Sequence, residues 1–272
     1  MKYRKSFELQ DKVAVVTGGI GILGRKFCAG LAEFGAKVAV VDLDENEARS
    51  YANELQNIYG VECIGVACDV TNQSSVKDMV SDVESILGQI EILHNNTATK
   101  GHNLENFFAP FEEYSLDAWN EVMSVNLSGM FLVAQAVGSK MVERGCGSII
   151  QTASIYGATM GPDPSIYAGS EYMGVQINTP PVYSASKGGV VAMSNYLATY
   201  WAKKGVRVNT LSPGGVASGQ NEIFSNKYSS RVPMGRMADS DEMVGALIFL
   251  ASDASSYITG QNIFIDGGLS AW

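Results

Sequence analysis

The sequence predicts an α/β fold: a Rossmann-type, doubly wound parallel sheet of about seven strands with helices on both faces. Three observations support this prediction. Short runs rich in β-branched residues recur along the chain, helix-length amphipathic stretches separate them, and glycines stand where those helices should end. The runs are apolar throughout, which is typical of strands covered on both faces. Alternation of strand and helix favours a parallel sheet joined by right-handed crossovers.

The predicted elements follow in chain order. The strands are Lys12–Thr17, Lys37–Asp42, Val61–Asp69, Ile90–His94, Gly147–Ala153, Val206–Leu211 and Asn262–Asp266. Helical spacing is clear in Leu23–Phe34 and Ser74–Leu87. Helix-ending caps are expected at Gly35, Gly60, Gly88, Gly145 and Gly205. Since no linker-like stretch interrupts this pattern, we expect one domain over residues 1–272, with long connections at Asn95–Ser115 and Ile155–Val182.

Composition and charge argue against several classes of partner. Nineteen Lys and Arg residues against 28 Asp and Glu residues give a net charge of −9, whereas nucleic acid or anionic lipid attracts a basic surface. No apolar run approaches the roughly 18 residues of a membrane span. The four cysteines form no CxxC pair and the two histidines no metal-ligand spacing. We expect a cytoplasmic protein without a metal, which binds neither nucleic acid nor membrane.

A glycine-rich turn, Thr17–Gly24, follows the first predicted strand and opens a helix. Glycines let the backbone turn tightly and approach a pyrophosphate, which the N–H groups at the start of the helix then bind. The residues expected to contact a dinucleotide here are Gly18, Gly21, Ile22, Leu23 and Gly24.

Asp42 ends the second predicted strand, where a carboxylate can accept hydrogen bonds from the ribose of an adenosine. A 2′-phosphate about 4 Å from it would cost on the order of 4 kcal/mol at an effective dielectric of about 20. Leu43 and further acidic residues follow, while Arg25 and Lys26 are expected to point along the helix. The sequence therefore predicts NAD rather than NADP, with Asp42 and Leu43 at the adenosine.

Tyr183 and Lys187 are four residues apart at the start of an apolar helical stretch, so they share one helix face. A lysine cation beside a phenol lowers the pKa of the tyrosine towards neutrality, which suits a general acid or base. Such pairs are common on helix surfaces, and spacing alone does not establish a catalytic role.

The order of the motifs over nearly the whole chain resembles that of the short-chain dehydrogenase/reductase family. The motifs are the glycine turn, Asp69-Val70, Asn95-Asn96-Thr97-Ala98, Asn126, Ser154, Tyr183 with Lys187, Pro213-Gly214 and the ending Ile258–Gly268. The resemblance implies an NAD(P)-dependent oxidoreductase that interconverts a secondary alcohol and a ketone, assembled as a homotetramer or homodimer.

The resemblance also implies a role for each matching residue. Tyr183 would be the catalytic acid/base, Lys187 its partner and a ribose ligand, Ser154 the residue that holds the substrate oxygen, and Asn126 the support for a proton-relaying water. Further cofactor contacts would come from Asp69 and Val70 at the adenine, from Asn95 beside the nicotinamide, and from Pro213, Gly214, Val216 and Ser218 near its amide.

The chain departs from the compact members of this family in three places, one of which is the Asn95–Ala98 motif, where Thr97 and Ala98 replace the expected alanine and glycine. Its turn has the sequence pattern TGxxGxxG, with Ile22 where those members have glycine. This pattern is typical of the extended members of the family, but the chain is too short for the C-terminal domain of those members. The segment at about 155–182, between Ser154 and Tyr183, is unusually long. It could be a surface or subunit-contact excursion, or a lid that binds substrate. Candidate substrate contacts are Ser154, Tyr156, Glu171, Gln176 and His102.

The polar groups of this segment favour a sugar, polyol or sugar-acid derivative, because paired hydrogen bonds orient polyhydroxylated ligands. Two alternatives remain open. An epimerase- or dehydratase-like enzyme would use the same residues and retain its NAD, and a non-catalytic sensor would bind the dinucleotide without needing Tyr183 and Lys187. A serine hydrolase is excluded, because Ser154 lacks a GxSxG context and no histidine follows it.

Overall fold

The β-branched runs of the sequence form seven parallel strands in the computed structural model, which describes residues 2–272. The strands are β1 (Val13–Thr17), β2 (Lys37–Asp42), β3 (Cys63–Ala67), β4 (Ile90–Asn95), β5 (Gly147–Thr152), β8 (Val206–Pro213) and β9 (Asn262–Ile265). All of β1 and the inner four residues of β2 are buried, as expected for strands covered on both faces. The predicted fold class is therefore confirmed, although β3 is shorter than the run Val61–Asp69.

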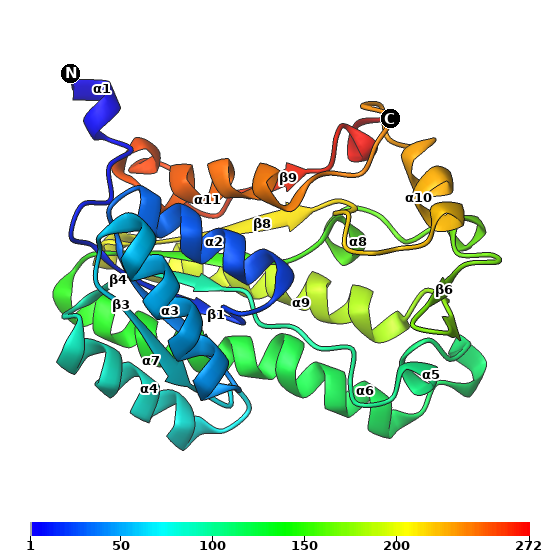
Figure 1. Ribbon diagram of the computed structural model, residues 1–272, viewed down its shortest axis with the longest axis horizontal. Helices are drawn as coiled ribbons and strands as arrows, with labels where there is room; N and C mark the ends of the chain where they lie inside the picture. Colours follow the sequence, from blue (N-terminus) through cyan, green and yellow to red (C-terminus); the bar gives the residue numbers. More distant parts are fainter. Residues whose placement is uncertain (1) are drawn as a thin grey trace.

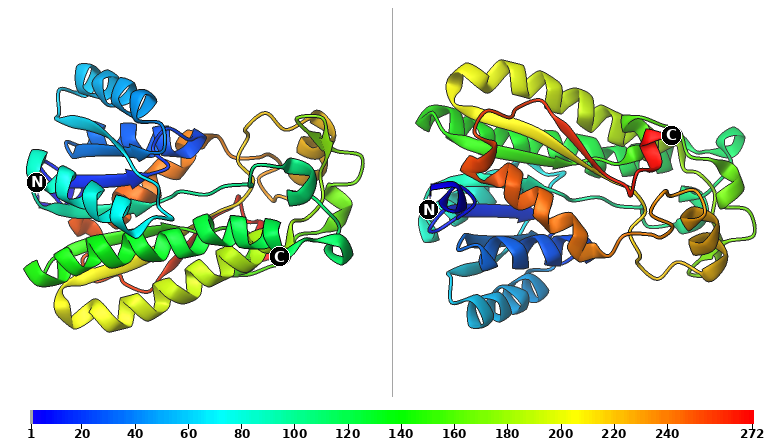
Figure 2. Two further views of the ribbon diagram at one scale, coloured as in Figure 1. Left: turned by 90° about the horizontal axis from the view of Figure 1, so that it is seen from below. Right: turned by 90° about the horizontal axis from the view of Figure 1, so that it is seen from above.

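Helices cover both faces of the sheet (Figures 1 and 2). One layer contains α2 (Ile22–Glu33), α3 (Glu45–Tyr59) and α11 (Val244–Ala251); the other contains α4 (Gln73–Ile86), α7 (Met130–Arg144) and α9 (Pro181–Trp201). The predicted cap glycines 35, 60, 88, 145 and 205 all adopt left-handed φ values, between +71° and +101°. These positions end helices because glycine alone reaches such angles without steric cost.

The remaining elements are short. They are α1 (Lys2–Lys5), α5 (Leu104–Phe107), α6 (Leu116–Met123), α8 (Ile155–Ala158), the hairpin strands β6 (Glu171–Tyr172) and β7 (Val175–Gln176), α10 (Glu222–Ser229) and several 3₁₀ turns. The hairpin was not predicted. It lies with α5 and α10 at one end of the molecule (Figure 1), beyond the carboxyl ends of the sheet strands.

A π-helical segment, Ser124–Gly129, joins α6 to α7 and makes one long helix, Leu116–Arg144. Its mean hydropathy reaches 1.4 over an 18-residue window, enough by length and composition to cross a membrane. Val133, Val137 and Met141 of this helix are fully buried against the sheet. Packing in the core therefore accounts for its apolar composition.

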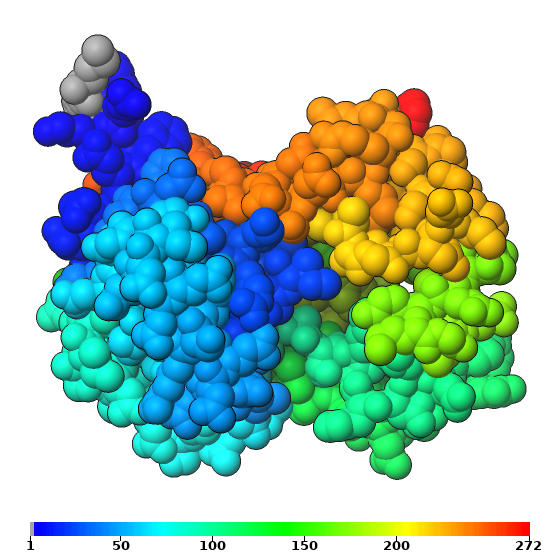
Figure 3. Space-filling model, viewed as in Figure 1, coloured from blue at the N-terminus to red at the C-terminus, as the bar shows by residue number. Residues whose placement is uncertain are grey.

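The strand order is β3-β2-β1-β4-β5-β8-β9. Successive strands are added on one side of β1 up to β3, and on its other side from β4 onward. Connections leave β1 and β4 towards opposite sides, so a crevice opens at their carboxyl ends, where open α/β sheets bind ligands. Figure 3 shows the molecule hollowed between its N-terminal part and the segments that follow β4, β5 and β8.

Candidate active site

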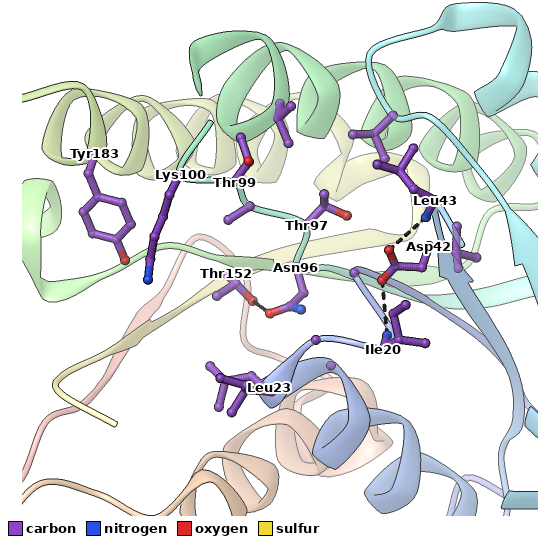
Figure 4. Close-up of a pocket in the computed structure, with 18 of the residues that line it drawn as sticks. Ile20, Leu23, Asp42, Leu43, Asn96, Thr97, Thr99, Lys100, Thr152 and Tyr183 are labelled. Atoms are coloured by element: carbon purple, nitrogen blue, oxygen red, sulfur yellow. Dashed lines mark hydrogen bonds between the residues drawn. The ribbon is translucent and has the colours of Figure 1, made fainter. Parts of the chain in front are cut away.

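A cavity of about 900 Å³ occupies this crevice (Figure 4). Its wall contains every residue expected to contact a dinucleotide except Asn95. These residues are Gly18, Gly21, Ile22, Leu23, Gly24, Asp42, Leu43, Asp69, Val70, Tyr183, Lys187, Pro213, Gly214, Val216 and Ser218. The parallel sheet brings them together because each follows the carboxyl end of a strand, apart from Tyr183 and Lys187, which lie in the first turns of α9.

The glycine turn has the close backbone packing that a pyrophosphate site requires. A Cβ on Gly24 would lie 1.9 Å from the Gly18 carbonyl oxygen, and Gly18 itself has a φ of +65°. Helix α2 begins after Gly21 with no side-chain cap and no acidic residue in its first turn. Its first N–H groups are therefore available to an anion. Ile22 is 58% exposed, so the variant turn accommodates this side chain without burying it.

Asp42 lies at one end of the cavity, and Tyr183 lies at the other (Figure 4). One carboxylate oxygen of Asp42 accepts the Ile20 N–H at 3.2 Å and the other accepts the Leu43 N–H at 2.8 Å. Each carboxylate oxygen can accept a further hydrogen bond. This geometry fits the ribose of an adenosine.

The two cationic side chains in the first turns of α2 form ion pairs outside the cavity. Arg25 forms an ion pair with Glu47, and Lys26 pairs with Asp241 at 3.0 Å. Neither side chain lines the cavity. The sequence-based expectation that these residues do not face the nucleotide agrees with this geometry.

Tyr183, Lys187 and Ser154 lie together where α9 begins; Ser154 and Lys187 are buried, and Tyr183 is partly buried. The Ser154 hydroxyl accepts the Tyr156 N–H at 3.2 Å and lies beside the Tyr183 phenol, and the Lys187 ammonium donates to the Thr152 carbonyl at 2.9 Å. Burial lowers the pKa of Lys187 to about 8, so this side chain is still mainly cationic at neutral pH. The three chemical groups are thus in place for transfer of one proton to or from a substrate oxygen.

The expected lowering of the tyrosine pKa is not found in this structure. Burial raises the pKa of Tyr183, against the opposing effect of the Ser154 hydrogen bond. The Lys187 ammonium lies 5.9 Å from the centre of the tyrosine ring and is held by a carbonyl. Desolvation of the phenol is therefore the largest effect on its pKa in this structure.

Asn126 is fully buried in the π-helical segment and does not line the cavity. Its side-chain oxygen accepts the Thr99 N–H at 2.7 Å, and its amide donates to the Thr99 carbonyl at 3.3 Å. Asn126 therefore anchors the connection after β4 to the long helix. Its implied support of a water molecule stays a prediction.

The expectation that Asn95 lines the nicotinamide side is wrong. Its side chain is fully buried, accepts from the Thr17 hydroxyl at 3.1 Å and donates to the Met130 carbonyl at 2.8 Å. The next residue, Asn96, lines the cavity instead and accepts from the Thr152 hydroxyl at 3.2 Å. Asn95 is the last residue of β4 and Asn96 is the first residue beyond it, so the two side chains lie in different environments.

A second cavity of about 300 Å³ adjoins the first and shares Tyr183 with it. Ser154 and Tyr156 line it, together with Tyr167, Tyr172 and further residues of the segment 155–182. Phe107 and Phe108, from the connection after β4, and Phe224 and Met237, from the region after β8, also form its apolar wall. The long segment therefore borders the catalytic group, which favours its interpretation as a lid.

The other three candidate substrate contacts are placed differently. Glu171 and Gln176 face each other across the β6–β7 hairpin, are exposed, and line neither cavity. The predicted contacts of these two residues are thus not formed in this structure, because the hairpin turns their side chains outward. His102 lines the first cavity, but its exposed ring contacts the Glu121 carboxylate through Nδ1. Among residues 2–272, no group of three His, Cys, Asp or Glu side chains could hold a metal ion.

The site combines a crevice shaped for a dinucleotide with a tyrosine, a lysine and a serine that can exchange a proton with a substrate oxygen. Such a combination defines a dinucleotide-dependent oxidoreductase, in which the cofactor carries the hydride chemistry and the protein orients it.

The chain belongs to the short-chain dehydrogenase/reductase family and is an NAD(P)-dependent enzyme of the class that acts on CH–OH groups. A family model described as short chain dehydrogenase matches residues 12–177, and one described as enoyl-(acyl carrier protein) reductase matches residues 169–270. The chain is 37% identical over 267 residues to D-threitol dehydrogenase of Mycolicibacterium smegmatis, covering 96% of this chain and 94% of that protein.

Two solved structures are similar over almost their full length. One is a gluconate 5-dehydrogenase from Burkholderia cenocepacia in complex with NADP and tartrate, with a TM-score of 0.85, 32% identity and 98% of each chain covered. The other is a short-chain dehydrogenase from Leptospira borgpetersenii with bound NAD⁺, with a TM-score of 0.83, 33% identity, and 98% and 95% of the two chains covered.

Proposed function

We propose that this protein is an NAD-dependent dehydrogenase that converts a secondary alcohol of a polyol or sugar acid into the ketone. The observation that carries this proposal is the meeting of the two cavities at Tyr183, with Ser154 beside it. One cavity suits a dinucleotide, and the other, at about 300 Å³, is at the small end of ligand sites. The names of the similar proteins, D-threitol dehydrogenase and gluconate 5-dehydrogenase, support the substrate class.

The proposed chemistry assigns one role to each buried group. A dinucleotide held by the glycine turn and Asp42 would supply the acceptor for the hydride that leaves the carbon of the alcohol. Tyr183, as phenolate, accepts the hydroxyl proton, and Ser154 donates a hydrogen bond to the oxygen as the carbonyl forms. Lys187 provides positive charge that favours the phenolate.

Reduction of NAD⁺ by a panel of compounds tests this function. Sugars, polyols, sugar acids and nucleotide sugars would be compared with aliphatic and steroid alcohols by the absorbance of the reduced cofactor. Turnover of one carbohydrate class supports the proposal, whereas turnover confined to the aliphatic or steroid alcohols contradicts it. If no compound reduces NAD⁺ and the purified protein contains NAD, the epimerase-like alternative is favoured instead.

Replacing Asp42 by Ala is expected to lower the preference for NAD over NADP, measured as the ratio of kcat/KM values, by about 10- to 100-fold. The substitution removes both a ribose acceptor and the charge that opposes a 2′-phosphate. Glu45→Ala is the matched control, because it removes a nearby carboxylate that does not line the cavity. A ratio that is unchanged in Asp42→Ala would show that this carboxylate does not select the cofactor.

We also propose that a second copy of the chain packs against α7 and α9, giving a homotetramer or homodimer. These helices lie side by side (Figure 2) and expose Phe131, Tyr196 and Tyr200, although large aromatic side chains are usually buried. Tyr196→Glu combined with Tyr200→Glu should lower the mass measured by light scattering, whereas Tyr3→Glu should not. A wild-type monomer would contradict this assembly.

A further inference from the structure

Among the described residues 2–272, Lys100 is the only charged residue that lines the second cavity. The rest of that wall is aromatic, aliphatic or neutral and polar, and includes five tyrosines. Lys100 also lines the first cavity, where it lies at the same end as Tyr183 and away from Asp42 (Figure 4). Its ammonium group is therefore available at the place where the substrate must meet the catalytic tyrosine.

Two contacts hold Lys100 in this position. The preceding residue, Thr99, is bound through its backbone to the buried Asn126 side chain. The Lys100 ammonium itself lies 3.6 Å from the centre of the Tyr172 ring, a cation–π contact with the β6–β7 hairpin. The long segment 155–182 thus contributes the aromatic face on which the cation rests.

No carboxylate neutralises this cation within residues 2–272. Lys100 forms no ion pair, and Glu121, which lines the first cavity nearby, is already bound by the ring and the backbone N–H of His102. Lys100 is exposed, so water partly screens its charge, and its attraction for an anion grows when a bound ligand displaces that water. The second cavity is therefore suited to a ligand that carries negative charge.

The number of cationic side chains in the wall of the second cavity indicates which kind of anionic group it can bind. Phosphate groups carry nearly two negative charges at neutral pH and are typically bound by several cationic groups. One ammonium group balances one carboxylate and can donate charge-assisted hydrogen bonds to it. The single lysine therefore favours a monocarboxylate.

We infer that Lys100 is a specificity residue that binds the carboxylate of the substrate, so that the substrate is a sugar acid and not an uncharged polyol. Tyr172 positions Lys100, and the oxidised hydroxyl lies on a different carbon from the carboxylate. This inference rests on the proposed function, because it places a substrate in the second cavity.

Paired substrates test the inference. D-gluconate and D-glucitol differ in the carboxylate, and other aldonates can be compared with their alditols in the same way. Lys100→Met should lower the aldonate-to-alditol ratio of kcat/KM by about 10- to 100-fold, mainly through the KM of the aldonate. Lys100→Arg should retain most of the ratio, Tyr172→Leu should lower it by about two- to fivefold, and Lys77→Met, an exposed lysine of α4, should not change it.

Ionic strength gives a second readout. Salt should raise the KM of the aldonate in the wild-type enzyme and leave that of the alditol unchanged. A ratio that is equal in wild type and Lys100→Met overturns the inference, while turnover of either substrate still supports the proposed function.

If neither compound is oxidised, a binding measurement tests the role of Lys100 separately from the proposed function. Titration calorimetry of the NADH-loaded protein with D-gluconate and D-glucitol then decides: gluconate binding that weakens in Lys100→Met supports the inference. Gluconate binding that is absent, or equal in the two proteins, overturns it.

Discussion

Tyr183→Phe is expected to reduce kcat for alcohol oxidation by about 10²- to 10⁴-fold, while dinucleotide binding stays close to that of the wild type. The substitution removes the phenol oxygen that is proposed to accept the substrate proton and leaves the glycine turn and Asp42 in place. Stopped-flow measurement of cofactor reduction and fluorescence titration with NADH measure the two quantities separately. An equal loss of turnover and of binding would contradict the acid/base role.

Tyr200→Phe is the matched control, because it removes a phenol hydroxyl from an exposed position of the same helix. Its turnover should equal that of the wild type. This comparison separates the chemistry at the active site from any general effect of removing a tyrosine hydroxyl from α9.

The pH dependence of the wild-type enzyme gives a further test of the same role. Oxidation needs the phenolate of Tyr183, and burial raises the pKa of that group. The oxidative rate should therefore increase as the pH rises from neutral to alkaline values, and the reductive rate should fall. An oxidative rate that does not vary with pH over this range would show that Tyr183 is not the proton acceptor.

Gly24→Ala is expected to weaken NADH binding by about 10- to 100-fold and to lower the free energy of unfolding by about 1–3 kcal/mol. The new Cβ would overlap the Gly18 carbonyl oxygen at 1.9 Å, so the turn must open or shift. Both changes displace the N–H groups at the start of α2. NADH titration and chemical denaturation measure the two effects.

Gly21→Ala provides the control within the same turn. Gly21 has a φ of −67°, which any residue can adopt, and a Cβ there would have one contact, at 3.2 Å from the Gly18 oxygen. We expect a much smaller loss of binding than in Gly24→Ala. Wild-type affinity in Gly24→Ala would contradict the assignment of this turn to the cofactor.

Local patterns in the sequence were sufficient for the sheet, its helices and most of the cofactor site. Strand and helix periodicity depends on which faces are buried, and the cap glycines depend on φ, so both can be inferred from neighbouring residues. The ends of parallel strands meet at one edge of a sheet, so motifs that follow strands assemble there without further information. Asp42 and the glycine turn were predicted in this way, whereas Tyr183 with Lys187 was predicted from helical spacing and from the resemblance to the family.

Only the tertiary structure decided which of two adjacent asparagines faces the crevice, because that depends on the register of β4 and on its partners Thr17 and Met130. It also decided that burial would raise the pKa of Tyr183, since desolvation depends on everything packed around the phenol.

The long segment illustrates the same limit. Its length and polar composition indicated a site at the active-site mouth, but the fold of the hairpin turned Glu171 and Gln176 outward and placed Tyr172 against Lys100. No sequence spacing links residues 100 and 172. The sequence by itself therefore determined the cofactor crevice, which depends on local patterns and strand ends, and its motifs indicated the reaction class through the resemblance to the family. The substrate cavity depends on contacts between distant connections, which arise only on folding.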